Sequence, residues 1–251
     1  MKYLNIIALL VLIVCTYSCC SKENNDGFVS LFDGKSLNGW EVKCIEKDRD
    51  NSFWTVDKGT ILCNSMDSDT HHYIWLQTRE EYGDFELRLK FQASREHKGN
   101  SGVQVRSRYY ENDVGEEGIK GWLDGPQVDI EPTNPWRNGL IYDETRVVQH
   151  WIHPVLPSWD ITPDDFPLDK LVHYFEDEGP GWNEMTIICD GMKIKTIVND
   201  VVVSDYDGSG VLDDEVHKKY RVGTRGHIAL QLHKNSQNFI RFKDIEIRVL
   251  D

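Results

Sequence analysis

The segment Gln127-Val128-Asp129-Ile130-Glu131 places one amide and two carboxylates at alternate positions. On a β-strand, alternate side chains share a face, so Gln127, Asp129 and Glu131 would point one way and the two aliphatic residues the other. Neighbouring carboxylates on one face repel each other. They occur on a solvated edge, around a cation, or as an acid and base whose pKa values are driven apart. An exposed polar strand face is the simplest reading of this segment alone.

Other segments show the same division into a polar and an apolar face. Gln231 and His233 alternate with leucines, and Gln104 and Arg106 alternate with valines. If these polar faces belong to one concave sheet, they converge with Asp129 in a groove that can satisfy many sugar hydroxyls. Polar outer faces of unrelated strands are the alternative. Sugars also stack on aromatic rings, although most tryptophans pack in protein cores.

Histidine pairs offer a second kind of chemistry. His71-His72 and the pair His150 and His153 each suggest a metal, but no further ligand spacing supports either, so solvated loop histidines are favoured. The chain has no GxSxG, no HExxH and no glycine-rich phosphate loop. The common signatures of serine hydrolases, zincins and nucleotide-binding enzymes are therefore missing.

An all-β sandwich would bring such residues together. Apolar and polar residues alternate along the chain, and turn residues recur at intervals of about ten, as in sandwiches. The pattern predicts strands over residues 85–91 and 103–106, a three-stranded meander over 185–203, and closing strands over 226–233 and 239–249. The length suits a single domain over residues 27–251.

Two long segments depart from the alternating pattern. Residues 109–125 are rich in glycine, glutamate and aromatic residues, and residues 134–171 contain Trp136, Trp151 and Trp159. Long loops are uncommon in compact domains unless they serve a site. Both segments are predicted to be loops that wall one end or one face of the sandwich.

Charge and cysteine content restrict the class of partner. A net charge of −14 repels phosphate backbones and anionic membrane surfaces, so nucleic acid is excluded as a partner and a neutral ligand fits better. After the N-terminal segment the only cysteines are Cys44, Cys63 and Cys189, without regular spacing. This pattern excludes a disulfide scaffold and a zinc ribbon, and leaves a Cys44–Cys63 bridge open.

The N-terminus reads as an export signal. An apolar run too short to span a bilayer follows a positive start, and Ser18 precedes Cys19-Cys20. We expect residues 1–18 to be a lipoprotein signal peptide, Cys19 (or else Cys20) to be acylated, and residues 19–26 to be a polar tether. The protein would then be anchored in the cell envelope, facing the periplasm or the outside, with cleavage and release as the alternative.

The chain resembles the 3-keto-disaccharide hydrolase domain family, which is common in Bacteroidetes, over about residues 28 to 250. The shared motifs, in the same order, are Leu31–Trp40, Asn100–Ser107, Gln127–Ile130, Gly139–Glu144 and Gly226–His233. The resemblance implies a concanavalin A-like lectin/glucanase jelly roll that acts on glycosides oxidised to a ketone at carbon 3. It also implies that Arg106, Gln127, Asp129, Tyr142, Gln231 and His233 lie in or near the sugar site. We expect Asn100 and Gln104 to bind substrate as well.

The chemistry implied differs from ordinary glycoside hydrolysis. Laminarinase-type enzymes of this fold carry a Glu-x-Asp-x-Glu strand, and here Gln127 stands where the nucleophilic glutamate would be, which puts retaining hydrolysis in doubt. A ketone at carbon 3 acidifies the proton on carbon 2. One base can then remove that proton and eliminate the glycosidic group, provided that a donor stabilises the enolate.

The residues are assigned to that chemistry as a hypothesis. His233 or Glu131 is the base, Asp129 orients the substrate or acts as the acid, and Arg106 and Gln127 bind the keto or hydroxyl oxygens. No cofactor is required, although a divalent cation held by Asp129, Glu131 and His233 could replace Arg106 as the enolate stabiliser. The alternative functions are a carbohydrate-binding lipoprotein without catalysis and a structural or adhesion domain of the cell envelope.

Overall fold

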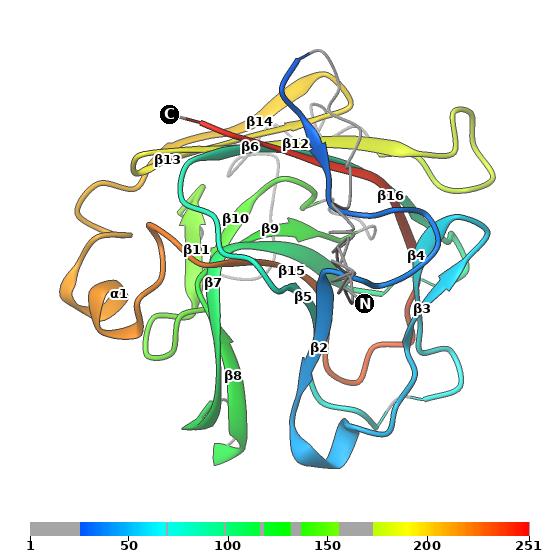
Figure 1. The fold of residues 1–251 in the computed structure, drawn as a ribbon, viewed down its shortest axis with the longest axis horizontal. Helices are drawn as coiled ribbons and strands as arrows, with labels where there is room; N and C mark the ends of the chain where they lie inside the picture. The colour runs from blue at the N-terminus through cyan, green and yellow to red at the C-terminus, as the bar shows by residue number, and fades with distance from the viewer. Residues whose placement is uncertain are drawn as a thin grey trace, which may run out of the picture.

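The computed structural model describes residues 26–68, 70–97, 99–115, 118–131, 137–155 and 173–250. They form two antiparallel eight-stranded sheets that pack against each other, which confirms the predicted all-β jelly-roll class (Figure 1). We call them the outer sheet and the inner sheet.

The outer sheet has the order β14-β13-β12-β6-β16-β4-β3, with β1 also paired to β16. Its strands are β1 (Val29–Ser30), β3 (Trp54–Asp57), β4 (Thr60–Asn64), β6 (Phe85–Ala93), β12 (Asn183–Asp190), β13 (Lys193–Val198), β14 (Val201–Asp207) and β16 (Phe239–Val249). The inner sheet has the order β11-β10-β9-β7-β15-β5-β2, with β8 also paired to β7. Its strands are β2 (Trp40–Cys44), β5 (Ile74–Thr78), β7 (Ser101–Val114), β8 (Lys120–Asp124), β9 (Pro126–Ile130), β10 (Ile141–Asp143), β11 (His150–His153) and β15 (His227–Leu232). A 3₁₀ turn, η1 (Glu46–Asp48), and a short helix, α1 (Glu215–Tyr220), lie between strands.

The main core lies between the two sheets and follows the predicted alternation. The apolar residues of β6, from Phe85 to Phe91, are buried in it, as are Val103 and Val105 of β7 and Val128 and Ile130 of β9. Each strand thus buries its apolar face and directs the intervening residues away from the core. On the inner sheet those intervening residues form the floor of the site described below.

The prediction that residues 109–125 form a loop is wrong. β7 continues to Val114 and β8 pairs back onto it, so the segment is a hairpin (Figure 1). Trp122 and Leu123 of this hairpin pack with Tyr73, Trp75 and other residues in a second apolar cluster. The glycine and glutamate content hid this strand, because an exposed twisted ribbon needs less regular alternation than a sheet over a core.

The described part of the segment 134–171, residues 137–155, is not all loop as predicted. It contains β10 and β11 at one edge of the inner sheet, and Trp151 lies in β11. Trp136 and Trp159 lie outside the described residues. The two short strands escaped prediction because each has too few residues to show a period.

Cys44, Cys63 and Cys189 are buried and free. Cys44 lies in the inner sheet and Cys63 in the outer sheet, so the bridge left open by the sequence does not form. The predicted signal peptide, Cys19 and all of the tether except Asp26 lie outside the described residues. None of the helices in the described part of the chain is long and apolar enough to cross a membrane.

Candidate active site

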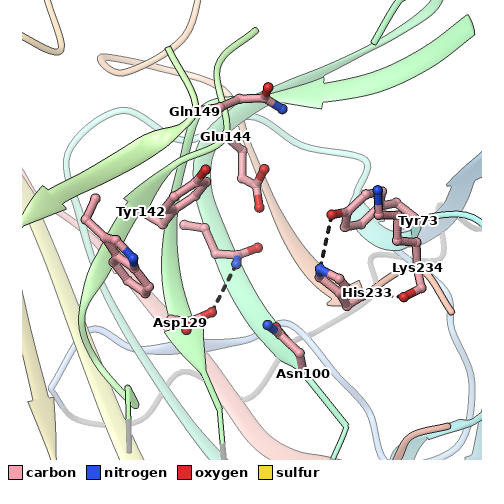
Figure 2. Close-up of a pocket in the computed structure, with 10 residues that line it drawn as sticks. Tyr73, Asn100, Asp129, Tyr142, Glu144, Gln149, His233 and Lys234 are labelled. Atoms are coloured by element: carbon pink, nitrogen blue, oxygen red, sulfur yellow. Dashed lines mark hydrogen bonds between the residues drawn. The ribbon is translucent and has the colours of Figure 1, made fainter. Parts of the chain in front are cut away.

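A pocket of about 320 Å³ opens over the inner sheet on the side away from the core (Figure 2). Strands β9, β10 and β11 supply one side, and the residues that follow β15 supply the other. The lining residues are Tyr73, Asn100, Gln127, Asp129, Tyr142, Glu144, Gln149, Trp151, His233 and Lys234. The predicted site residues Asn100, Gln127, Asp129, Tyr142 and His233 therefore meet in one place.

The register of the sheet explains how the floor of the pocket forms. Gly102 of β7 pairs with Asp129 of β9 on one side and with Gln231 of β15 on the other. A Cβ atom on Gly102 would lie 2.5 Å from Cδ of Gln127, so the glycine leaves the space that the Gln127 side chain fills. Gln127 then donates from Nε2 to Oδ1 of Asp129 at 3.2 Å, while its Oε1 has no hydrogen-bond partner among the described residues.

Asp129 is a buried carboxyl group whose proton affinity is strongly altered. Burial raises its pKa to about 7, Arg137 opposes this rise, and the charge of Glu131 adds to it. Nε of Arg137 lies 3.3 Å from Oδ2 of Asp129, and Nη2 of Arg137 lies 2.8 Å from Oε2 of Glu131. Asp129 can therefore both donate and accept a proton near neutral pH, as a general acid or base must.

Arg137 was not predicted from the sequence, and it pairs with the carboxylate of Glu131. Glu131 is engaged by Arg137 and by its own backbone contact with Asn138, and it does not line the pocket formed by the described residues. The structure thus places Glu131 beside Asp129 but behind the pocket wall. Arg137 lies in the segment read as a loop, where strand alternation offered no signal.

His233 faces Asp129 from the other side of the pocket (Figure 2). Its Nδ1 lies 3.0 Å from the carbonyl oxygen of Lys234, and its Nε2 lies 3.1 Å from Oη of Tyr73. A carbonyl only accepts, so Nδ1 carries the hydrogen, and in the neutral form of the ring the lone pair is on Nε2. The ring of Tyr73 also packs edge-to-face on His233, with centroids 4.8 Å apart.

Glu144 is a second buried carboxylate in the pocket that the sequence reasoning did not single out. Its Oε1 accepts from Nε2 of Gln231 at 3.3 Å, and its carbonyl accepts from Nε1 of Trp122 at 2.8 Å. The signal was available, because Glu144 stands two residues after Tyr142 and so shares its side of the strand. The other lining residues that were missed are Tyr73, Gln149, Trp151 and Lys234.

Gln104 and Gln231 lie beneath the pocket and do not line it. Both side chains are fully buried. Gln104 donates weakly to the carbonyl of Leu123 at 3.4 Å, and Gln231 supports Glu144. These two predicted substrate-binding residues therefore lie on the same face of the inner sheet as Gln127 and Asp129 without lining the pocket.

The prediction that Arg106 shares the pocket is wrong. Arg106 has a positive φ of 49°, and the pairing of β7 with β15 shifts register there, as at a β-bulge. A bulge breaks the period of two, so Arg106 does not follow Gln104 onto the same face. Its guanidinium instead donates to Asp84 at 2.6 Å and to the carbonyls of Gly83 and Gly191. Arg106 is thus a structural residue away from the pocket.

The predicted cation ligands do not come together as a set. Among the described residues no group of three or more histidine, cysteine, aspartate or glutamate side chains could hold a metal ion. Asp129 and Glu131 are instead paired with Arg137.

The fold and the pocket together define a jelly-roll protein whose inner sheet carries a pocket lined by a buried carboxyl group and a histidine. The sequence profile of the 3-keto-alpha-glucoside-1,2-lyase-like domain matches residues 27–248. The chain belongs to this family, as its motifs indicated.

Known proteins similar to this chain are of two kinds. The 3-keto-disaccharide hydrolase of Bacteroides thetaiotaomicron is 34% identical over 84 residues, a match that covers 31% of this chain and 27% of that protein. Two solved structures of candidate glycosyl hydrolases from Parabacteroides distasonis share the fold. One has a TM-score of 0.52 at 17% identity, covering 90% of this chain and 95% of its own. The other has a TM-score of 0.50 at 22% identity, covering 89% of this chain and 99% of its own.

Proposed function

We propose that this protein cleaves glycosides whose sugar carries a ketone at carbon 3. The observation that carries the proposal is the placement of a buried Asp129, with a pKa of about 7, and of His233, whose Nδ1 is held by a backbone carbonyl, on opposite sides of one pocket. Family membership supports the substrate class, since both the family and the curated relative are described by 3-keto sugars.

The reaction needs one base and one acid. The base removes the proton from carbon 2, and the electron pair of the C–H bond forms an enolate with the ketone at carbon 3. The enolate then returns its electrons to make a double bond between carbons 1 and 2, and the bond from carbon 1 to the glycosidic oxygen breaks. The leaving oxygen takes a proton from the acid. Water can afterwards add across the double bond, hydroxyl to carbon 1 and hydrogen to carbon 2, which gives the free keto sugar.

We assign the base to Nε2 of His233 and the acid to the protonated form of Asp129. Oη of Tyr73 lies 3.1 Å from Nε2 of His233. Once Nε2 carries the proton taken from carbon 2, it would donate a hydrogen bond to this hydroxyl. Asn100 and Gln127 have buried side-chain oxygens without partners among the described residues, and these would accept hydroxyl hydrogens of the sugar. Glu144 is the competing candidate for the base.

The test is an assay of the purified domain with a chromogenic 3-keto-glucoside, comparing His233→Ala, Asp129→Asn and Glu144→Gln. We expect His233→Ala and Asp129→Asn to lose roughly 100-fold or more in kcat/KM, the contribution of a positioned acid or base. Wild-type activity should decline as pH rises above about 7, because Asp129 then loses its proton. Unchanged rates for both variants would remove the assignment, and a loss confined to Glu144→Gln would make Glu144 the base.

A carbohydrate-binding protein without catalysis is the alternative outcome of this assay. Thermal-shift measurements with glucosides and their 3-keto forms separate the two, because a ligand at 100 times its Kd stabilises by about 2.7 kcal/mol. Stabilisation without product release would replace the enzymatic proposal by the binding one. We propose for either case that the protein is held in the cell envelope by a lipid on Cys19.

A further inference from the structure

His217 is a buried histidine that lies outside the pocket. Its side chain is 1% exposed, in α1, and both of its ring nitrogens contact carboxylates. Nε2 lies 2.8 Å from Oδ2 of Asp143, and Nδ1 lies 2.8 Å from Oδ1 of Asp214. Asp143 is fully buried, whereas Asp214 is partly exposed.

The hydrogen bonds define the protonation of this group. Oδ1 of Asp214 also accepts from the backbone nitrogens of Val216 and His217, as an ionised N-cap does. Oδ1 of Asp143 accepts from the backbone nitrogen of Thr145 at 2.9 Å. An ionised carboxylate only accepts, so with both carboxylates ionised each ring nitrogen of His217 carries a hydrogen and the ring is an imidazolium. In agreement, burial lowers the pKa of His217, but the hydrogen bonds and charges of Asp143 and Asp214 outweigh it and leave the pKa raised.

Asp143 connects this group to the pocket. It lies between Tyr142 and Glu144, which both line the pocket, and its side chain points to the opposite side of β10. β10 has only three residues; it pairs with β9 on one side and, with a shift of register, with β11 on the other. A strand this short has few ladder hydrogen bonds, so the hydrogen bond of its buried side chain to His217 contributes to its position.

α1 is itself bound to the inner sheet. Oη of Tyr110, in β7, donates to the carbonyl of Tyr220 at the end of α1 at 2.6 Å. Arg221 then ends the helix in the left-handed region, with φ of 54°. The chain of contacts therefore runs from β7 through α1 and His217 to Asp143 and β10.

We infer that His217 is a positioning residue: through the hydrogen bonds of its two ring nitrogens to Asp143 and Asp214 it ties α1 to β10 and holds Tyr142 and Glu144 in the pocket wall. This inference rests on the proposed function only for its effect on catalysis, and the tie itself can be measured without substrate. The charged and titratable groups around it are Asp143 of β10, Asp214 before α1, and Tyr206 of β14, whose hydroxyl is affected by the charge of Asp143.

The decisive comparison is Asp143→Asn against Asp143→Ala. Both remove the negative charge, but the asparagine Nδ2 can donate to Nε2 of a neutral His217, whose Nδ1 hydrogen still goes to Asp214. The tie then survives in Asp143→Asn and is lost in Asp143→Ala. We expect kcat/KM to stay close to wild type in Asp143→Asn and to fall about 100-fold in Asp143→Ala, as displaced active-site groups do.

Two further measurements keep the test independent of activity. Amide hydrogen exchange over residues 141–146 should accelerate in Asp143→Ala and His217→Gln and stay slow in Asp143→Asn. ¹H–¹⁵N spectra should show both ring nitrogens of His217 protonated in the wild type and only Nδ1 in Asp143→Asn. The matched control is Asp84→Ala, which breaks the pair with Arg106 away from the pocket and should leave both exchange and kcat/KM unchanged.

Wild-type exchange over residues 141–146 in Asp143→Ala would overturn the inference. Equal impairment of Asp143→Asn and Asp143→Ala would do so as well, since the hydrogen bond that asparagine keeps would then not be what holds β10. Absence of turnover by the wild type with every 3-keto-glucoside would sink the proposed function instead, and the exchange and spectral data would still decide the role of His217.

Discussion

Asp129 couples the chemistry of the pocket to the stability of the fold. Its pKa in the folded protein is about 7, against an ordinary value of 3.8, so the folded state holds this proton more tightly than the unfolded state does. Its favourable contribution is therefore complete below about pH 4 and is lost as pH rises to about 7.

This difference predicts the behaviour of Asp129→Asn. The amide is neutral at every pH, so the melting temperature of the variant should fall less between pH 5 and pH 8 than that of the wild type. Calorimetry at both pH values measures this, and His217 adds the same trend to both proteins, so the difference isolates Asp129. Parallel curves for the two proteins would contradict the assignment of a buried, proton-binding carboxyl group.

Residue by residue, strand alternation predicted the site where strands are regular. Gln127 and Asp129 were placed correctly because β9 is regular, and His233 because β15 keeps its alternation to the end. The prediction placed Arg106 on the wrong face because the β-bulge there is a backbone feature that the residue type does not reveal. Arg137 could not be predicted as a site residue, because it lies between two strands. Its contacts with Asp129 and Glu131 depend on the tertiary fold, and strand alternation carries no information about them.

At the scale of elements, the β7–β8 hairpin supports one side of the pocket. Nε1 of Trp122 donates to the carbonyl of Glu144, and the Trp122 ring packs edge-to-face on Trp75 and Tyr73. The hairpin therefore touches residues on both sides of the pocket, Glu144 on one and Tyr73 on the other.

This role predicts that two substitutions of Trp122 lower stability to different degrees. Trp122→Ala should lose about 3–5 kcal/mol of unfolding free energy, as a large buried ring does. Trp122→Phe keeps most of the packing but leaves the Glu144 carbonyl without its donor, which should cost about 1–3 kcal/mol and lower kcat/KM. Urea titration and turnover of the folded variants measure both. The control is Phe242→Leu in the main core, which should lower stability alone; equal loss of activity there would show that the hairpin has no special role.

At the scale of the whole molecule, the sandwich was predictable and its pairing order was not. Strands β6, β12, β13, β15 and β16 follow from the alternation, because a sheet over a core must be apolar on one face. Which strands become neighbours depends on contacts distant in sequence, such as β6 between β12 and β16, that no local pattern encodes.

The anchor at Cys19 is a prediction about the intact chain. Cys19→Ser should abolish labelling by radioactive palmitate and move the protein from the membrane to the soluble fraction of the expressing cells. Cys20→Ser is the matched control and should leave both unchanged. The opposite result would place the lipid on Cys20, and membrane retention of the double variant without label would exclude lipidation.

The pairing of β1 with β16 places the N-terminal end of the domain on the outer sheet. Val29 sits opposite Ile247 in the outer sheet, whereas the pocket opens from the inner sheet on the side away from it. A lipid on Cys19, ten residues before β1, would draw the outer sheet toward the bilayer and turn the mouth of the pocket to the aqueous space. Sugars arriving by diffusion would then reach the open side of the pocket directly, and the tether would not block its mouth.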